Sequence, residues 1–125
     1  MITRLDHLQL TMPAGEEEKA RAFFGGLLGM QEQTKPAPLA GRGGCWFRAG
    51  EAFLHVSVER EFAPQKKGHP AFCVQDLQAL AGRLERARCT VTWDTTLPGR
   101  TRFFTADPFG NRIECLLDGE GFSQK

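Results

Sequence analysis

The chain contains three histidines, and each lies in a short segment with the pattern of a β-strand. His7 and His55 are in segments where polar and apolar residues alternate, and His69 begins a third, mostly apolar one. Glu114 is a carboxylate inside a further apolar run, where it needs a partner. Imidazole nitrogens and carboxylate oxygens are ligands of divalent transition metals. We therefore predict a metal site formed by His7, His55, His69 and Glu114.

This donor set contains nitrogen and oxygen but no thiolate, which suits Fe, Mn, Ni, Co or Zn and does not choose among them. Strands fix the direction of their side chains, so ligands from separate strands can converge and leave coordination positions open. A divalent ion with open positions can bind neighbouring substrate oxygens and stabilise an oxyanion. The predicted catalytic residues are Glu114, acting as a base, and His55, acting at or beside the metal.

Aromatic and basic residues close to these positions are candidates for substrate binding. Arg102 is the preferred anchor for an anionic group, because it shares pleat parity with Phe104 on the strand expected to pair with the Glu114 strand. Arg48 and Arg112 are alternatives to it. Phe104 and Trp46 are the preferred members of an apolar lining. The other aromatic residues considered for that lining are Phe47, Phe62 and Phe103.

Glu114 lies in the second strand of a predicted β-hairpin. Residues 107–111 form its turn, in which Pro108 presets φ and Gly110 or Asn111 takes the left-handed position. The turn fixes the register of the two strands, and the register decides the face to which Glu114 points.

The chain is expected to contain one order of elements twice. A strand over residues 5–12, an amphipathic helix over 16–30, a weak strand, a glycine loop at 41–44 and two further strands come first. A polar connection then leads to the second half. It begins with a strand, continues with a helix over 77–87 that Asp76 can cap, and ends with three more strands. Both halves therefore have the order βαβββ, over approximately residues 1–60 and 68–120. Each half carries one candidate ligand on its first strand and one on its last.

The run DPFGNRIE at residues 107–114 resembles the last hairpin of the vicinal oxygen chelate superfamily, which includes glyoxalase I, bleomycin and fosfomycin resistance proteins and extradiol dioxygenases. The resemblance covers nearly the whole chain. It implies an α+β fold with two βαβββ modules that form a U-shaped sheet around a metal ion, as a single domain over residues 1–125. It also implies that Glu114 is a ligand and that His7, His55 and His69 occupy the other ligand positions. Many relatives use three ligands, and the position of His55 is often Glu or a non-ligand.

The resemblance implies a metal-dependent lyase, isomerase or ring-opening enzyme that acts on a small oxygenated substrate. One alternative is a metal-free small-molecule binding protein similar to the bleomycin resistance proteins, and another is a fosfomycin-type thiol transferase. Extradiol cleavage is disfavoured, because that chemistry usually uses an additional His or Tyr and the chain has no Tyr and no spare His.

The resemblance also implies a symmetric homodimer. In many single-domain relatives the two half-sheets around a metal belong to different chains. We therefore expect each site to take His7 and His55 from one subunit and His69 and Glu114 from the other. A site closed by the two modules of one chain is the alternative.

Composition excludes several other classes of protein. A formal net charge of +1 and 41% hydrophobic residues do not indicate a nucleic-acid partner, disorder or a membrane span. The N-terminus lacks the features of a signal peptide, so we expect a cytoplasmic protein. The four cysteines have no zinc-ribbon spacing and are expected to be buried thiols.

Overall fold

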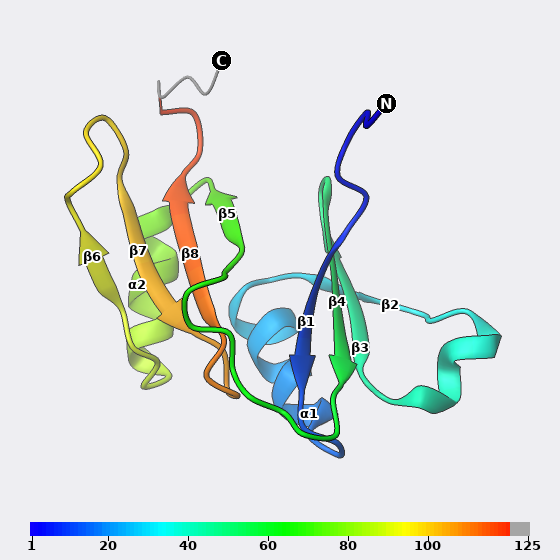
Figure 1. Ribbon diagram of the computed structural model, residues 1–125. Coiled ribbons are helices and arrows are strands. Elements are labelled where there is room, and N and C mark those ends of the chain that lie inside the picture. Colours follow the sequence, from blue (N-terminus) through cyan, green and yellow to red (C-terminus); the bar gives the residue numbers. More distant parts are fainter. Residues whose placement is uncertain (121–125) are drawn as a thin grey trace. The chain divides into compact units, whose positions relative to one another are not determined.

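The computed structural model describes residues 1–120 of the chain. The chain divides into two compact units, Met1–Gln65 and Lys66–Lys125. Each unit contains one mixed four-stranded sheet and its own helix (Figure 1), which confirms the predicted α+β class with two βαβββ modules. No helix among residues 1–120 has the length and apolar character needed to cross a membrane.

The first unit places its helix against the sheet. Its elements are β1 (Leu8–Met12), α1 (Glu17–Ala20), the π-helical η1 (Arg21–Leu27), β2 (Gln31–Gln33), the 3-10 helix η2 (Ala37–Arg42), β3 (Cys45–Ala49) and β4 (Ala52–Val58). The strand order is β1-β4-β3-β2, with β1 parallel to β4 and the other pairs antiparallel. Alternate residues such as Leu10, Leu54 and Val56 are buried together with Phe23 and Phe24 of the helix. This burial of apolar surface holds the unit together.

The helix predicted over residues 16–30 is shorter in the structure and changes type along its length. It is α-helical only through Ala20 and continues as a π-helix to Leu27. Gly25 and Gly26 lower helix propensity there, and Gly29 adopts φ of 73° just beyond the end. Sequence periodicity identified the buried face of this segment but not the wider turn.

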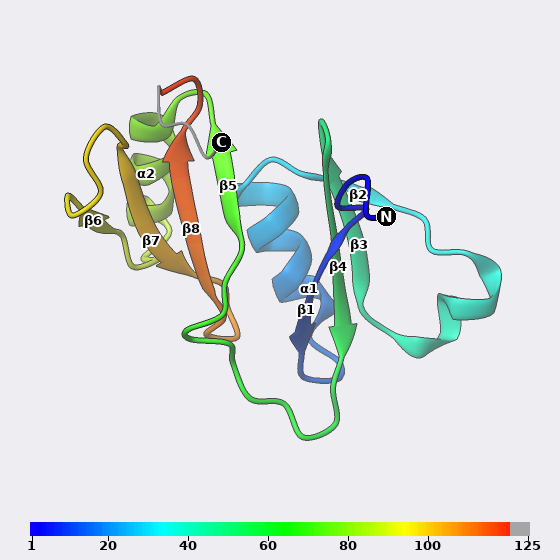
Figure 2. The same ribbon diagram turned by 45° about the horizontal axis from the view of Figure 1, so that its top comes forward.

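The second unit has the same plan with a regular α-helix. Its elements are β5 (Ala71–Val74), α2 (Leu77–Arg86), β6 (Thr92–Asp94), β7 (Arg102–Ala106) and β8 (Arg112–Leu117), and the strand order is β5-β8-β7-β6. The Asp76 carboxylate caps α2 as predicted, accepting a hydrogen bond of 3.0 Å from the Ala79 amide. Helix α2 covers one face of this sheet in both views (Figures 1 and 2). The other face carries Arg102 and Glu114 together with the apolar residues Phe104 and Leu116.

The β7–β8 hairpin is organised by the Asp107 side chain. Its Oδ1 accepts hydrogen bonds from the backbone amides of Phe109 and Asn111, each at 2.9 Å, and its Oδ2 accepts one of 2.8 Å from the Asn111 side chain. Gly110 takes the left-handed position with φ of 92°. Burial raises the pKa of Asp107. The turn predicted from the sequence is therefore present, with a buried carboxylate at its centre.

The strand registers of the two units match at the candidate ligands. His55 lies opposite Gln9 in the parallel β1–β4 pair, and Glu114 lies opposite Ala71 in the parallel β5–β8 pair. His7 is two residues before Gln9, and His69 is two residues before Ala71. On the antiparallel side His55 faces Trp46, and Glu114 faces Phe104. His55 and Glu114 therefore hold equivalent places in the strand pairing, whereas His7 and His69, which were expected on the first strands, lie just before β1 and β5.

The loop before β3 contains a glycine that the packing requires. Gly44 has φ of 80°, and a Cβ atom added there would lie 2.2 Å from the Val56 carbonyl oxygen. Its amide donates a hydrogen bond of 2.8 Å to the Glu17 carboxylate, which ties the loop to α1. Part of the glycine loop expected at residues 41–44 is instead the end of η2.

We expect Gly44→Ala to destabilise the protein more than Gly50→Ala. Both positions have positive φ, which costs an alanine roughly 1–2 kcal/mol. Gly50 has open space around the added methyl group, whereas at Gly44 that group meets backbone atoms that cannot swing away. Urea unfolding of both variants measures the difference in the free energy of unfolding. Equal losses would contradict the close approach of this loop to β4.

Candidate functional site

The face of the second sheet that lies away from α2 carries most of the predicted site residues. Alternation along β7 and β8 buries Phe103, Ile113 and Cys115 on the helix side. Cross-strand partners share a face, so Phe104 and Glu114 project together on the opposite side. On its surface this face combines acidic, basic and aromatic groups.

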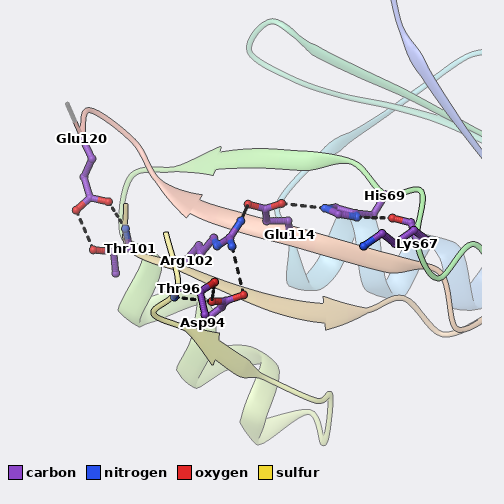
Figure 3. A network of polar contacts seen from close by, with 8 residues as sticks. All are labelled: Lys67, His69, Asp94, Thr96, Thr101, Arg102, Glu114 and Glu120. Carbon is purple, nitrogen blue, oxygen red and sulfur yellow. Dashed lines mark hydrogen bonds and ion pairs between the residues drawn. The ribbon is translucent and has the colours of Figure 1, made fainter. Parts of the chain in front are cut away.

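Glu114 is a nearly buried carboxylate, 7% exposed, with a cationic or imidazole donor on each oxygen. Its Oε1 lies 2.9 Å from His69 Nε2, and its Oε2 accepts a hydrogen bond of 2.9 Å from Arg102 Nη1. Arg102 Nη2 reaches Asp94 Oδ2 at 3.3 Å, and Thr96 holds Asp94 in turn. These side chains form a continuous chain of contacts along the sheet (Figure 3). The sequence predicts that Glu114 needs a partner, and the structure provides two, His69 and Arg102.

The protonation of Glu114 follows from two opposing effects. Burial raises its pKa, but hydrogen bonds from His69 and Arg102, together with their charges, outweigh burial and lower it. Glu114 is consequently a carboxylate at neutral pH. An ionised oxygen is available both as a ligand and as a proton acceptor.

His69 has the hydrogen-bond pattern of a ligand whose ring is held in place. Its Nδ1 lies 2.9 Å from the carbonyl oxygen of Lys67, and a carbonyl can only accept, so Nδ1 carries a proton. In the neutral ring Nε2 then presents a lone pair toward Glu114 Oε1. Two acceptors at 2.9 Å need a shared cation, which is either a second imidazole proton or a metal ion. Metal-binding histidines commonly donate their other N–H to a carbonyl in this way, so this pair fits a divalent metal.

The pair in the first unit is arranged differently. The rings of His7 and His55 stack with centroids 4.0 Å apart and planes inclined by 20°, and Trp46 stacks on the other side of His55 at 3.8 Å. The lone pair of an imidazole lies in its ring plane, so a single ion bound to both rings requires one ring to turn. Burial, followed by the charge of His7, lowers the pKa of His55 and favours its neutral form. Asp6 accepts from His7 Nδ1 at 2.9 Å.

The candidate ligands thus occur as two pairs, one in each unit. Within residues 1–120 no group of three or more His, Cys, Asp or Glu side chains is gathered closely enough to hold a metal ion. The predicted substrate residue Phe104 contacts the ring of His69 edge-on at 5.4 Å. Trp46 lies flat on His55, and Arg102 is engaged by two carboxylates.

Sequence reasoning missed Asp94 and the Lys67 carbonyl. Asp94 lies opposite Arg102 in the β6–β7 pairing, so an opposite-charge cross-strand pair was the available signal for it. The carbonyl has no side-chain signal at all, because any residue at that position supplies it.

The expectation of four buried thiols is wrong for Cys73, which is exposed, and Cys89 is only half-buried. Cys45 and Cys115 are buried, and burial raises the pKa of Cys45 to about 11 and that of Cys115 to about 12. These two thiols are protonated at neutral pH and are poor nucleophiles.

We expect Arg102→Met to lower the free energy of unfolding by about 3–5 kcal/mol, because it leaves the buried Glu114 charge with one partner fewer. Adding Glu114→Gln to that variant should restore part of the loss, since the charge is then removed. Arg21→Met is the matched control, because Arg21 also contacts two carboxylates but in an exposed setting. Its loss should be about 1 kcal/mol or less. Equal losses at Arg102 and Arg21 in chemical denaturation would contradict the buried role.

Comparison with known proteins identifies the family that the chain matches. The model of the glyoxalase/bleomycin resistance protein/dioxygenase superfamily matches residues 4–115. The crystal structure of a glyoxalase family protein from Bacillus anthracis is 44% identical, with a TM-score of 0.90 over 94% of this chain and 96% of that one. No curated protein matched.

More distant structures share the fold. A genomically encoded fosfomycin resistance protein from Listeria monocytogenes has a TM-score of 0.75 at 15% identity over 94% of each chain. A lactoylglutathione lyase from Agrobacterium tumefaciens has a TM-score of 0.66 at 19% identity, covering 89% of this chain and 92% of that one. With the family model matched over most of its length, the chain belongs to the glyoxalase/bleomycin resistance protein/dioxygenase superfamily.

Proposed function

We propose that the protein is a metal-dependent enzyme of glyoxalase type, a lyase or isomerase that acts on a small oxygenated substrate. The observation that supports this proposal is the contact between His69 Nε2 and Glu114 Oε1 at 2.9 Å, because two atoms placed this way share either a proton or a metal ion. The Lys67 carbonyl and Arg102 hold the far sides of these two groups. A pair fixed at both ends is already organised to receive an ion.

In this proposal the ligands are His7, His55, His69 and Glu114, with one of the two stacked imidazole rings turned toward the ion, and residues 1–125 act as one functional domain. A bound divalent ion would supply Lewis-acid stabilisation of a substrate oxyanion. Glu114 would accept a proton from the substrate at Oε1 only when that oxygen has left the ion, and Arg102 keeps the carboxylate ionised beforehand. His55 acts beside it, and its lowered pKa leaves a ring nitrogen free of a proton. Arg102, Phe104 and Trp46 line the substrate position.

A second candidate function is the binding of a small molecule without turnover. The observation that favours it is the stack of Trp46, His55 and His7, which presents flat rings of the kind that pack against planar ligands. Turnover of lactoylglutathione or of fosfomycin by the metal-loaded protein would exclude this candidate. Tight ligand binding that survives removal of metal, without turnover, would favour it.

We expect about one equivalent of a divalent transition metal per chain after loading, as measured by elemental analysis. A ligand that binds only the folded state stabilises it by about 2.7 kcal/mol when present at 100 times its dissociation constant, so the thermal midpoint should rise. His69→Ala and Glu114→Gln should each weaken binding by roughly 10-fold or more. His55→Ala should weaken it or alter its pH dependence, because a ligating imidazole must be deprotonated.

The control for this measurement is Cys73→Ser, which removes the exposed thiol and should leave the stoichiometry unchanged. A wild-type protein that retains less than about a tenth of an equivalent and shows no thermal shift would refute the metal proposal. Unchanged binding in His55→Ala alone would reduce the set to three ligands.

We also propose that the protein is a homodimer whose sites combine His7 and His55 of one subunit with His69 and Glu114 of the other. Proteins of this superfamily often form dimers. Two inactive variants, His7→Ala and Glu114→Ala, are unfolded together and refolded as a mixture. A heterodimer with shared sites carries both lesions in one site and leaves the other intact. Metal binding should therefore return in part, as measured by elemental analysis of the mixture.

Each variant refolded alone is the control and should stay without metal. If the mixture also stays without metal while sedimentation shows heterodimers, each site is built within one chain. A monomer in sedimentation would refute the dimer itself.

A further inference from the structure

The open face of the second sheet carries a second arginine beside the ion-pair network. Arg112 on β8 places its guanidinium carbon 3.9 Å from the centre of the Phe104 ring, and Arg102 lies 5.3 Å from the same centre. Phe104 is the cross-strand partner of Glu114, and Arg112 is two residues before Glu114 on the same pleat. One aromatic ring is therefore in contact with two guanidinium groups next to the carboxylate of the proposed site.

The two arginines differ in their partners. Arg102 is held by Glu114 and Asp94 at 2.9 Å and 3.3 Å, so two carboxylates already compensate its charge. Among residues 1–120 no aspartate or glutamate forms an ion pair with Arg112, although its side chain is half-buried. A half-buried cation loses part of its hydration, and without an anionic partner no ion pair offsets that free-energy cost. Arg112 therefore has no anionic partner for its N–H donors, whereas Arg102 has a carboxylate at each of its two terminal nitrogens.

The guanidinium carbon of Arg112 lies over the Phe104 ring, 3.9 Å from its centre. A guanidinium that lies on a ring directs its N–H groups outward in its own plane, where they match the two oxygens of an oxyanion. Formal charges on this face cancel among Asp94, Arg102, Arg112 and Glu114. Asp94, Arg102 and Glu114 pair with one another, and Arg112 is left without an ion pair among these four, so an anionic ligand is its complementary partner.

We propose that Arg112, stacked on Phe104, is the residue that binds an oxyanion carried by the ligand of this protein. The chemical class is a carboxylate, phosphate or phosphonate with two oxygens in one plane. This assignment replaces Arg102 as the anchor, because Arg102 serves Glu114 and Asp94 instead. It builds on the proposed function only in placing the ligand on the same face as Glu114.

The test titrates inorganic phosphate, methylphosphonate and acetate separately into the metal-free full chain and follows the arginine Nε–Hε and backbone amide resonances. Anions should shift the Arg112 signals in a saturable manner, with dissociation constants in roughly the millimolar range. Arg112→Met should weaken binding about 10-fold or more, as expected for loss of a charge-assisted hydrogen-bond pair. The three probes show which oxyanion is preferred.

Arg48→Met is the matched control. Arg48 also lies over a phenylalanine, with its guanidinium carbon 4.8 Å from the Phe53 ring, but it is exposed on the first unit. Its loss should leave the anion affinity unchanged. If Arg112→Met does not fold, Arg112→Lys replaces it, and a several-fold weakening is expected because the planar fork is lost.

The inference is overturned if wild type shows no saturable shift up to about 100 mM anion, far above a millimolar dissociation constant. It is also overturned if the Arg112 variant binds like wild type, or if Arg48→Met weakens binding equally. Elemental analysis of the same variants keeps the two proposals apart, and Arg112→Met should retain metal. Wild type that binds anions through Arg112 but takes up no metal refutes the proposed function and leaves this inference standing.

Discussion

The carboxylate of Asp107 is the constraint on which the second sheet depends. By accepting two backbone amides and one side-chain amide, it closes the turn that joins β7 to β8 in a single register. A slip of one residue would exchange the two faces of β8 and send Glu114 into the packing against α2. Burying this group is unfavourable, as its raised pKa shows, so its three hydrogen bonds are needed to offset the burial.

With the register fixed, the chemistry of the open face is a matter of charge balance. Glu114 stays ionised in spite of burial because an imidazole and a guanidinium both reach it. The same carboxylate in an apolar setting would be protonated and would be a poor ligand. In the first unit the protonation of His55 is set by its surroundings. The ring lies between Trp46 and His7, and its lowered pKa favours the neutral form. One pair is thus held by charge and the other by stacking.

The sequence predicted those features that depend on local pattern. The hairpin, the Asp76 cap, the two βαβββ modules and the equivalence of His7 with His69 follow from turn residues, alternation and repetition, and the structure contains them. Features that depend on which groups meet in space were not accessible. Periodicity does not distinguish an α-helix from the π-helix of η1. Composition does not show that Arg102 forms ion pairs with two carboxylates. Whether the four candidate ligands act together stays a prediction.

The matched registers also show which parts of this architecture can carry different chemistry. Backbone pairing, rather than side-chain identity, brings position 55 opposite Trp46 and position 114 opposite Phe104. An imidazole at one place and a carboxylate at the other show that the same backbone position tolerates either chemistry. A strand arrangement that occurs twice supplies two equivalent positions, and their side chains can differ in chemistry. The backbone hydrogen bonds keep these two positions equivalent although one carries an imidazole and the other a carboxylate.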